Sequence, residues 1–328
     1  MTRLFTDGAE FGDSLFWDSF SGAISSAYHR SGVYSYAVSS GNSDKSFTAS
    51  SETYLRIPFN LGNSTNHNIM WRMLSAGGTE MECRFNNGTY KLEFYLSGTT
   101  KILTSSNAVS YASWVVLEVH WLINDTSGIF GIKINGLPDG DYSGDAKGTG
   151  STIDTLRLCP NYGTNQYYDD LALNNTSGTS DTSWCGSGRV ELLKPTAEGY
   201  TNQWSVSTGS THWSLVDDIP PNNDTDYIYS STANQIDAFG LEDFDSTDRT
   251  IKRVWAEVRA YDYGASAAQI SLGFRTTEGT NYFSTTNNTL SGSYARHISD
   301  DFTTNPATSS TWQDADIDAL QLLIKEVS

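Results

Sequence analysis

The chain has 328 residues, 38% of them hydrophobic and 12% aromatic, which is enough for two domains with packed cores. Its 20 basic and 38 acidic residues give a formal net charge of −18. The basic residues are scattered singly, so the composition excludes a nucleic acid or an anionic membrane as a partner. The acidity itself has two explanations that stay open here: solubility through self-repulsion, and the binding of divalent cations.

Targeting signals and metal-binding cysteine motifs are both missing from the sequence. Residues 1–3 are followed by acidic and polar residues, and no run approaches the ~18 apolar residues of a membrane span. We therefore expect a soluble protein that is made in a cytoplasm and has no membrane insertion. The cysteines lack the spacing of zinc ligands and are expected to be small buried side chains. They are Cys83, Cys159 and Cys185.

Short segments with alternating apolar and polar residues follow one another at even spacing through the first half of the chain. Gly, Asn and Ser residues separate them, as at Asn135-Gly136, and this is turn chemistry. About ten such strands with a period of two predict an antiparallel β-sandwich or barrel. The predicted strands are Val33–Ser39, Tyr54–Phe59, Asn68–Leu74, Thr79–Phe85, Tyr90–Leu96, Lys101–Thr104, Trp114–Ile123, Gly128–Ile134, Thr152–Leu158 and Tyr168–Leu173.

The alternation breaks over residues 193–220, where Pro195 and a later Pro-Pro pair interrupt it. We interpret this break as the end of one domain followed by a linker, so the predicted domains are residues 1–192 and 193–328. Alternating segments then resume and predict further β-structure. The strands expected there are Asp226–Ser230, Thr250–Tyr261, Gln269–Thr276, Asn281–Ser284, Tyr294–Asp300 and Leu322–Val327.

One segment near the C-terminus predicts a short helix. Ser309-Ser310-Thr311 is a cap signal, and aspartates follow it in the first turns. The apolar residues Ile317 and Leu320 share a face in that register, so the helix is expected to dock on a sheet.

Glu80 and Glu82 lie two residues apart in a predicted strand and therefore share one face of the sheet. Such a pair nearly meets the ~5–5.5 Å carboxyl spacing of retaining glycosidases. The next position on that face is Arg84, whose charge keeps both carboxylates ionised and removes the general acid that hydrolysis requires. No serine-hydrolase or zinc-protease motif is present either. We predict an ion-paired sheet face and no enzymatic activity.

Asp169-Asp170 stands at the head of a predicted strand, although aspartate is a poor strand former. Three explanations compete: a catalytic pair, a metal site, and a turn at the strand end. The first and last strands of a sandwich are commonly neighbours, which places the acidic N-terminal block beside this pair. Calcium accepts about 6–8 oxygen ligands. The candidate ligands of a structural Ca²⁺ are Glu10, Asp13, Asp169 and Asp170.

Four aromatic residues near predicted turns are candidate ligand contacts, because the apolar face of an exposed ring can stack on a sugar. Aromatic residues at strand spacing mostly belong to the core, and this alternative stays open for each of the four. They are Tyr162, Tyr167, Tyr168 and Trp184.

Several stretches of the first domain resemble one family. They are F-x-D-G-A-E-F-G-D at Phe5–Asp13, G-V-Y-S-Y-A-V at Gly32–Val38, W-V-V-L-E-V-H-W at Trp114–Trp121 and Y-Y-D-D-L-A-L-N at Tyr167–Asn174. These stretches are similar to the concanavalin A-like lectin and glucanase superfamily, in particular to the laminin-G-like jelly rolls of tailed-bacteriophage virion proteins. Trp184–Gly199 and the chain that follows resemble the end of such a module and the second β-domain often fused to it.

The resemblance implies two stacked antiparallel sheets, often a calcium ion, and glycan or protein binding on a rim or a concave face. We expect an all-β fold with an N-terminal jelly roll, followed by a second, smaller β-sandwich with one short helix near the C-terminus. The predicted function is that of a non-enzymatic virion protein, either a head decoration, a head fibre or a tail-associated adhesin, assembled in the host bacterial cytoplasm. Expected partners are other virion proteins, further copies of the chain, and a cell-surface glycan. The alternative is a carbohydrate-active enzyme or a secreted carbohydrate-binding module.

Overall fold

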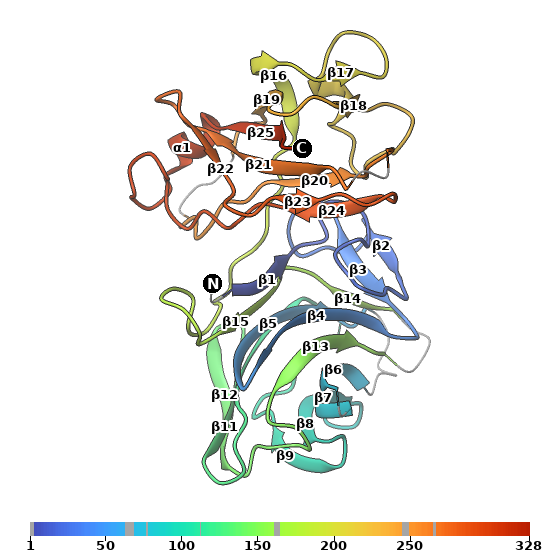
Figure 1. Ribbon diagram of the computed structural model, residues 1–328. Helices are drawn as coiled ribbons and strands as arrows, with labels where there is room; N and C mark the ends of the chain where they lie inside the picture. The colour runs from blue at the N-terminus through green and yellow to red at the C-terminus, as the bar shows by residue number, and fades with distance from the viewer. Residues whose placement is uncertain are drawn as a thin grey trace. The chain divides into compact units, whose positions relative to one another are not determined.

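The computed structural model describes residues 3–62, 69–76, 78–111, 113–160, 165–244, 249–264 and 267–328. The chain divides into two compact units, Met1–Leu192 and Leu193–Ser328 (Figure 1). Both units consist almost wholly of antiparallel β-structure, so the protein is all-β. Within the described residues, no helix is long and apolar enough to cross a membrane.

The first unit contains a nine-stranded sheet, in which the two terminal strands of the unit pair with each other. Strand β15 follows β14 after a turn at Asp170, whose φ of +50° is a left-handed conformation that aspartate tolerates better than most residues. The strands run in the order β12 (Leu137–Gly144), β11 (Gly128–Ile134), β10 (Val115–Leu122), β5 (Glu52–Asn60), β14 (Gln166–Tyr168), β3 (Ser35–Val38) and β2 (Ala23–Ser25), with β15 (Leu171–Asn175) on β5 and β1 (Arg3–Asp7) on β15.

A six-stranded sheet forms the other layer of the first unit. Figure 1 shows its long strands curving across the nine-stranded sheet. Its strands run in the order β4 (Ser43–Ser50), β13 (Ile153–Leu158), β6 (Ile69–Ser75), β7 (Gly78–Asn86), β8 (Lys91–Leu96) and β9 (Thr100–Thr104). Asn68, which was included in the predicted strand before Ile69, lies outside the described residues.

The two sheets bury one common core, as period-two alternation requires. Leu55 and Ile57 of β5 point into it from one side, and Cys83 and Phe94 point into it from the other. Cys159 is also buried, and all three cysteines are free thiols. Side chains at the intervening positions of the six-stranded sheet therefore face away from the core, and these carry the charges.

The second unit has three smaller antiparallel sheets and a separate core around Phe239, Phe274 and Trp312. A 3₁₀ turn, Trp213–Leu215, and a short helix, α1 (Asp314–Asp318), accompany the strands. The strands are β16 (Pro195–Asn202), β19 (Ile236–Leu241), β25 (Gln321–Glu326), β21 (Gln269–Arg275), β22 (Asn281–Phe283) and β23 (Asn288–Thr289) in one sheet, β17 (Ser205–Val206) with β18 (Ile228–Tyr229), and β20 (Glu257–Ala260) with β24 (Ala295–Ile298).

Four predicted elements differ from the observed ones. The expected strand Tyr168–Leu173 is divided into β14 and β15 by the turn at Asp169-Asp170. The expected linker at Pro195 is instead edge strand β16, which tolerates proline at its first position because no ladder donor is needed there. The expected strand Thr250–Tyr261 pairs only over β20, after a single bridge at Val254. The helix begins later than its predicted cap, because the N–H of Gln313 donates to the carboxylate of Asp316 at 2.9 Å.

Candidate functional site

The structure brings Glu10, Asp169 and Asp170 together in the first unit, and adds Arg30 and Ser31, which the sequence did not indicate. We call these five residues the acidic latch. Asp170 is fully buried and is saturated with donors. Its carboxylate pairs with the Arg30 guanidinium and accepts the Ser31 hydroxyl at 2.9 Å. It also accepts the N–H of residue 190 at 2.6 Å, so a single carboxylate ties three distant segments together.

Asp169 is equally buried and binds backbone groups of the same loop. Its Oδ2 accepts the N–H groups of Arg30 at 2.7 Å and Ser31 at 3.2 Å, and its Oδ1 accepts the N–H of Asp170 at 2.7 Å. Burial, and then the neighbouring charge of Asp170, raises the pKa of Asp169 to about 9.

Glu10 completes the acidic latch from the N-terminal segment. Its Oε2 accepts the N–H of Val33 at 2.7 Å, while its buried Oε1 has no hydrogen-bond partner among the described residues. The backbone of Gly32 lies so close that a Cβ there would be 2.1 Å from the Glu10 carboxyl carbon, so only glycine fits. Burial is the main cause that raises the pKa of Glu10 to about 7, and the charges of Asp170 and Asp7 add to it.

The residues of the acidic latch do not fit a calcium ion. Every carboxylate oxygen of Asp169 and Asp170 already accepts an N–H or O–H, which leaves only Oε1 of Glu10 for a cation that prefers 6–8 oxygens. Asp13 instead caps its own loop, where its Oδ1 accepts the N–H of Leu15 at 3.0 Å. Within the described part of the chain, no group of three or more His, Cys, Asp or Glu residues could hold a metal ion. The calcium hypothesis stays a prediction that chelation can test.

The three predicted aromatic contacts that the structure describes do not form one site. Tyr168 lies wholly in the core, where its hydroxyl donates to the carbonyl of Met70 at 2.9 Å, so its ring offers no face to a ligand in solvent. Tyr167 is half-buried and stacks on Tyr28, with 4.6 Å between ring centroids. Tyr162 lies outside the described residues.

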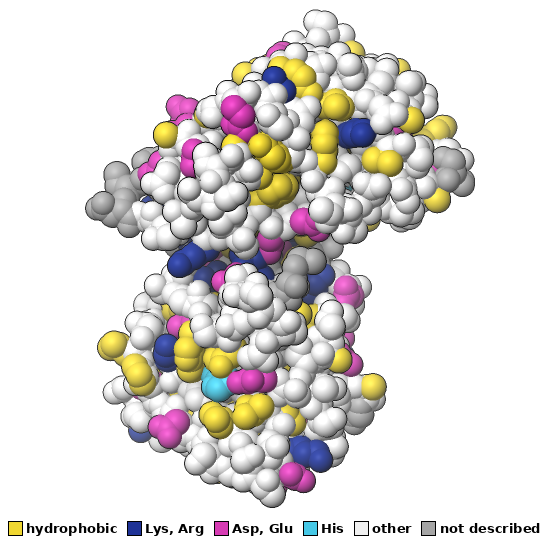
Figure 2. Space-filling model, turned by 60° about the vertical axis from the view of Figure 1, so that its left-hand side comes forward, with side chains coloured by type: hydrophobic (Ala, Val, Ile, Leu, Met, Phe, Trp, Pro, Cys, Tyr) yellow, Lys and Arg dark blue, Asp and Glu magenta, His cyan; other side chains and the backbone are white. Residues whose placement is uncertain are grey.

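Trp184 lies on the outer face of the nine-stranded sheet, half-buried against Tyr54 and His120. The ammonium of Lys133 lies 4.2 Å from its ring centroid and covers one side of the indole. Figure 2 shows a histidine beside acidic and hydrophobic side chains on the surface of the first unit. Tyr167 pairs with Asn60 of β5. Asn60 is six residues from Tyr54, which is about 20 Å along the strand. Trp184 and Tyr167 therefore cannot contact the same small ligand.

A more coherent arrangement crosses the outer face of the six-stranded sheet. Five residues on five neighbouring strands are in direct register, which makes a row about 19 Å long at the ~4.8 Å spacing of strands. We call it the charged row. It consists of Asp44 on β4, Arg157 on β13, Arg72 on β6, Glu82 on β7 and Tyr95 on β8.

Ion pairs hold the charged row in place. Both Nε and Nη2 of Arg157 donate to the carboxylate of Asp44, each at 2.6 Å, which is the strong bidentate geometry. Nε of Arg72 donates to Oε2 of Glu82 at 2.6 Å, and the other oxygen of Glu82 pairs with Arg84. These arginines stay partly exposed, whereas Glu82 is almost completely covered.

Arg72 lies at the centre of the charged row and is held by one ion pair. Its Nε donates to Glu82, and 27% of its side chain is exposed. Nη2 of Arg84 donates to the carbonyl of Gly98 at 2.7 Å, and the Arg84 guanidinium lies 4.0 Å from the centroid of the Tyr95 ring.

Glu80, the other acid on this sheet face, is enclosed by a loop. It accepts the hydroxyls of Ser75 at 2.7 Å and Thr149 at 2.8 Å, and the N–H of Gly150 at 2.8 Å. Burial acts to raise the pKa of Glu80, but these hydrogen bonds outweigh it and hold the pKa below its ordinary value. Neither acid of β7 has the surroundings of a general acid.

The sequence contains a signal for the charged row, although it was not used for a ligand site. Arg72 and Arg157 each interrupt an otherwise apolar strand, in I-M-W-R-M-L and I-D-T-L-R-L. A cation inside such a strand marks the face directed away from the core. The register that aligns residues of five strands depends on pairing between distant segments, so it could not be predicted from any one segment.

Comparisons with solved structures find distant likenesses. The chain is similar to the carbohydrate-binding module CBM66 of Bacillus subtilis, with 10% identity over 49% of this chain and 96% of that one, at a TM-score of 0.36. It is similar to the globular domain of T. cruzi calreticulin, with 8% identity over 53% of this chain and 88% of that domain, at a TM-score of 0.40. It is also similar to the galectin LEC-6 of Caenorhabditis elegans, with 12% identity over 40% of this chain and 89% of that one, at a TM-score of 0.31. No family model and no curated protein matches the sequence. The likenesses concern the fold alone.

Proposed function

We propose that the first unit binds a glycan on the charged row without transforming it. The observation that carries this proposal is the partly exposed guanidinium of Arg72, which Glu82 holds at the centre of the row. A sugar offers pairs of hydroxyl oxygens that accept hydrogen bonds from such a planar fork. Because the ion pairs already hold the side chains, little side-chain entropy is lost when a ligand binds.

The same ion pairs argue against catalysis. Both oxygens of Glu82 are engaged by arginines, and the hydrogen bonds around Glu80 keep that carboxyl in its ionised form. A glycosidase needs one carboxylic acid that stays protonated near neutral pH to protonate the leaving group. The function proposed is therefore recognition.

We further propose that the protein is an exposed component of a tailed-bacteriophage particle, as a head decoration, head fibre or tail-associated adhesin. Support comes from the resemblance of the motifs at Phe5–Asp13 and Tyr167–Asn174 to phage jelly rolls. Two β-sheet units are rigid scaffolds whose loops and faces can make contacts. Many copies on one particle would convert weak glycan binding into avidity. Other virion proteins and further copies of the chain are the partners that this role requires.

Two measurements test the two parts of this proposal separately. A glycan array that includes bacterial surface polysaccharides should give saturable binding of the full chain, and incubation with the bound glycan should release no shorter product. Immunogold labelling of purified particles should place the protein on the outer surface. Absence of array binding overturns the glycan-binding part, whereas absence of label overturns the virion part.

A further inference from the structure

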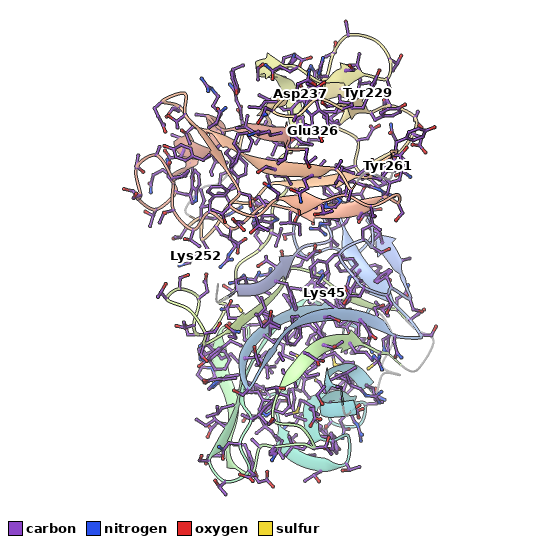
Figure 3. The ribbon with its side chains drawn as sticks, viewed as in Figure 1. Lys45, Tyr229, Asp237, Lys252, Tyr261 and Glu326 are labelled. Atoms are coloured by element: carbon purple, nitrogen blue, oxygen red, sulfur yellow. The ribbon has the colours of Figure 1, made fainter. Side chains whose placement is uncertain are left out.

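The second unit has a group of tyrosines on its surface that the proposal for the first unit does not use. Three of them are strongly exposed: Tyr227 at 42%, Tyr229 at 51% and Tyr263 at 91%. Tyr261 and Tyr294 lie among them and are partly covered. We call these five residues the tyrosine cluster. Figure 3 labels Tyr229 and Tyr261, which project from the same side of the unit.

The rings come from separate segments and lie close together. Tyr261 packs on Tyr294, with 4.4 Å between centroids, and lies 6.5 Å from Tyr263. Tyr227 and Tyr229 are 6.0 Å apart, the first just before β18 and the second at its end. The hydroxyl of Tyr294 donates to Asp224, three residues before Tyr227, and this hydrogen bond links the two groups.

Polar groups border the tyrosine cluster. The hydroxyl of Tyr294 donates to Oδ1 of Asp224 at 2.6 Å, and the guanidinium of Arg259 lies 5.4 Å from the centroid of the same ring. Asp224 is exposed. The surface therefore combines open aromatic faces with one fixed carboxylate and one fixed cation at their edges.

This combination selects among possible occupants. A polyanion is repelled by Asp224 and by the net charge of −18. A cationic group finds the face of Tyr294 already occupied by Arg259. The core of a protein–protein interface is depleted of charged residues, whereas Asp224 and Arg259 lie directly against Tyr294 in the tyrosine cluster.

We infer that the tyrosine cluster is a second binding surface, and that its ligand is a neutral polysaccharide. A neutral sugar has an apolar face that stacks on tyrosine, and a rim of hydroxyls that pair with Asp224 and with the tyrosine hydroxyls. This site lies in the other unit and is independent of the charged row.

Affinity electrophoresis in native gels tests this inference on the full-length chain. The gels contain a soluble β-glucan, a mannan, a galactan or, as the charged comparison, polygalacturonate. The protein carries Arg72→Ala and Arg157→Ala so that the first unit does not contribute. We expect at least one neutral polysaccharide to retard it, and the additional change Tyr227→Ala with Tyr263→Ala to weaken retardation about five- to tenfold.

Matched variants separate stacking from folding. Tyr227→Phe with Tyr263→Phe keeps the rings and should keep most of the retardation. Tyr200→Ala removes another exposed tyrosine of the same unit, 43% exposed, whose ring is already covered by Arg275 at 4.0 Å, and should change nothing. Equal near-UV circular dichroism of all variants is the folding control.

Each other outcome overturns the inference. These outcomes are no retardation by any neutral polysaccharide, retardation by polygalacturonate alone, and equal retardation of the alanine and parent proteins. A change in sedimentation of the alanine variant without a change in retardation would assign the tyrosine cluster to contacts between copies of the chain.

Discussion

Arg72 on β6 and Glu82 on β7 lie opposite each other on the outer face of the six-stranded sheet, with 2.6 Å between Nε and Oε2. The carboxylate is almost fully covered, while the Arg72 side chain stays 27% exposed. Burying only the anion of a pair is unfavourable unless its partners stay in place, so Glu82 holds Arg72 in one orientation. This pair is the centre of the proposed glycan site.

Glu82→Gln tests the positioning role of this carboxylate. The amide keeps one acceptor but loses the charge that holds two arginines, so we expect glycan affinity to fall about three- to tenfold. Hydrolysis of the glycan should be undetectable in both wild type and variant. Measurable turnover in the wild type that disappears in Glu82→Gln would identify an enzyme instead.

The acidic latch should be important for the stability of the first unit. Arg30→Ala leaves Asp170 buried without its cation, and such losses cost about 3–5 kcal/mol of unfolding free energy. Arg189→Ala, in the more exposed pair with Glu191, is the matched control and should cost less than about 1 kcal/mol. Urea unfolding of both variants measures the difference, and equal losses would contradict this role.

Glu10 should make stability depend on pH in a defined direction. Because its pKa is raised from 4.5 to about 7, the folded state holds a proton that the unfolded state has lost, and stability falls as pH rises across that window. Glu10→Gln mimics the neutral acid, so it should resemble the wild type at pH 5 and be more stable at pH 8 by about 3 kcal/mol.

Denaturant melts of wild type and Glu10→Gln from pH 4.5 to 8.5 check this prediction. Asp169, whose pKa is raised by burial and by Asp170, should leave the variant with a remaining slope of the same sign. A variant that is less stable than the wild type at pH 8 would mean that the ionised Glu10 carboxylate is stabilising.

Calcium should have no effect on the first unit. Since donors already occupy the oxygens of Asp169 and Asp170, thermal unfolding should give the same Tm with excess chelator and with millimolar Ca²⁺. Ligand binding to the folded state always raises Tm. A fall of several degrees on chelation, reversed by Ca²⁺, would restore the metal site predicted from the sequence.

Local pattern was enough to predict most of the fold. Period-two alternation indicated strands such as β10 and β11, and the neighbouring first and last strands of the unit appear as the pairing of β1 with β15. Alternation also placed Glu80 and Glu82 on one outward face. It failed for Thr250–Tyr261, because alternation records burial and does not require a pairing partner.

The site residues were harder to predict, because contacts between distant segments decide them. Tyr167 and Tyr168 are adjacent in sequence, yet one stacks near the surface and the other is fully buried. Arg30, 140 positions from Asp170, has no local feature that marks it as the partner of a buried acid. Arg72 and Arg157 become neighbours only through the register of β6 and β13.

Calorimetric titration of the glycan selected on the array into wild type, Arg72→Ala and Lys133→Ala tests the central claim most directly. Lys133 is the matched control, because it lies on the nine-stranded sheet over Trp184. We predict saturable binding to wild type and Lys133→Ala, and an affinity at least about tenfold weaker for Arg72→Ala. Unchanged affinity in Arg72→Ala would contradict a glycan site on the charged row, and loss in Lys133→Ala alone would move that site to the nine-stranded sheet.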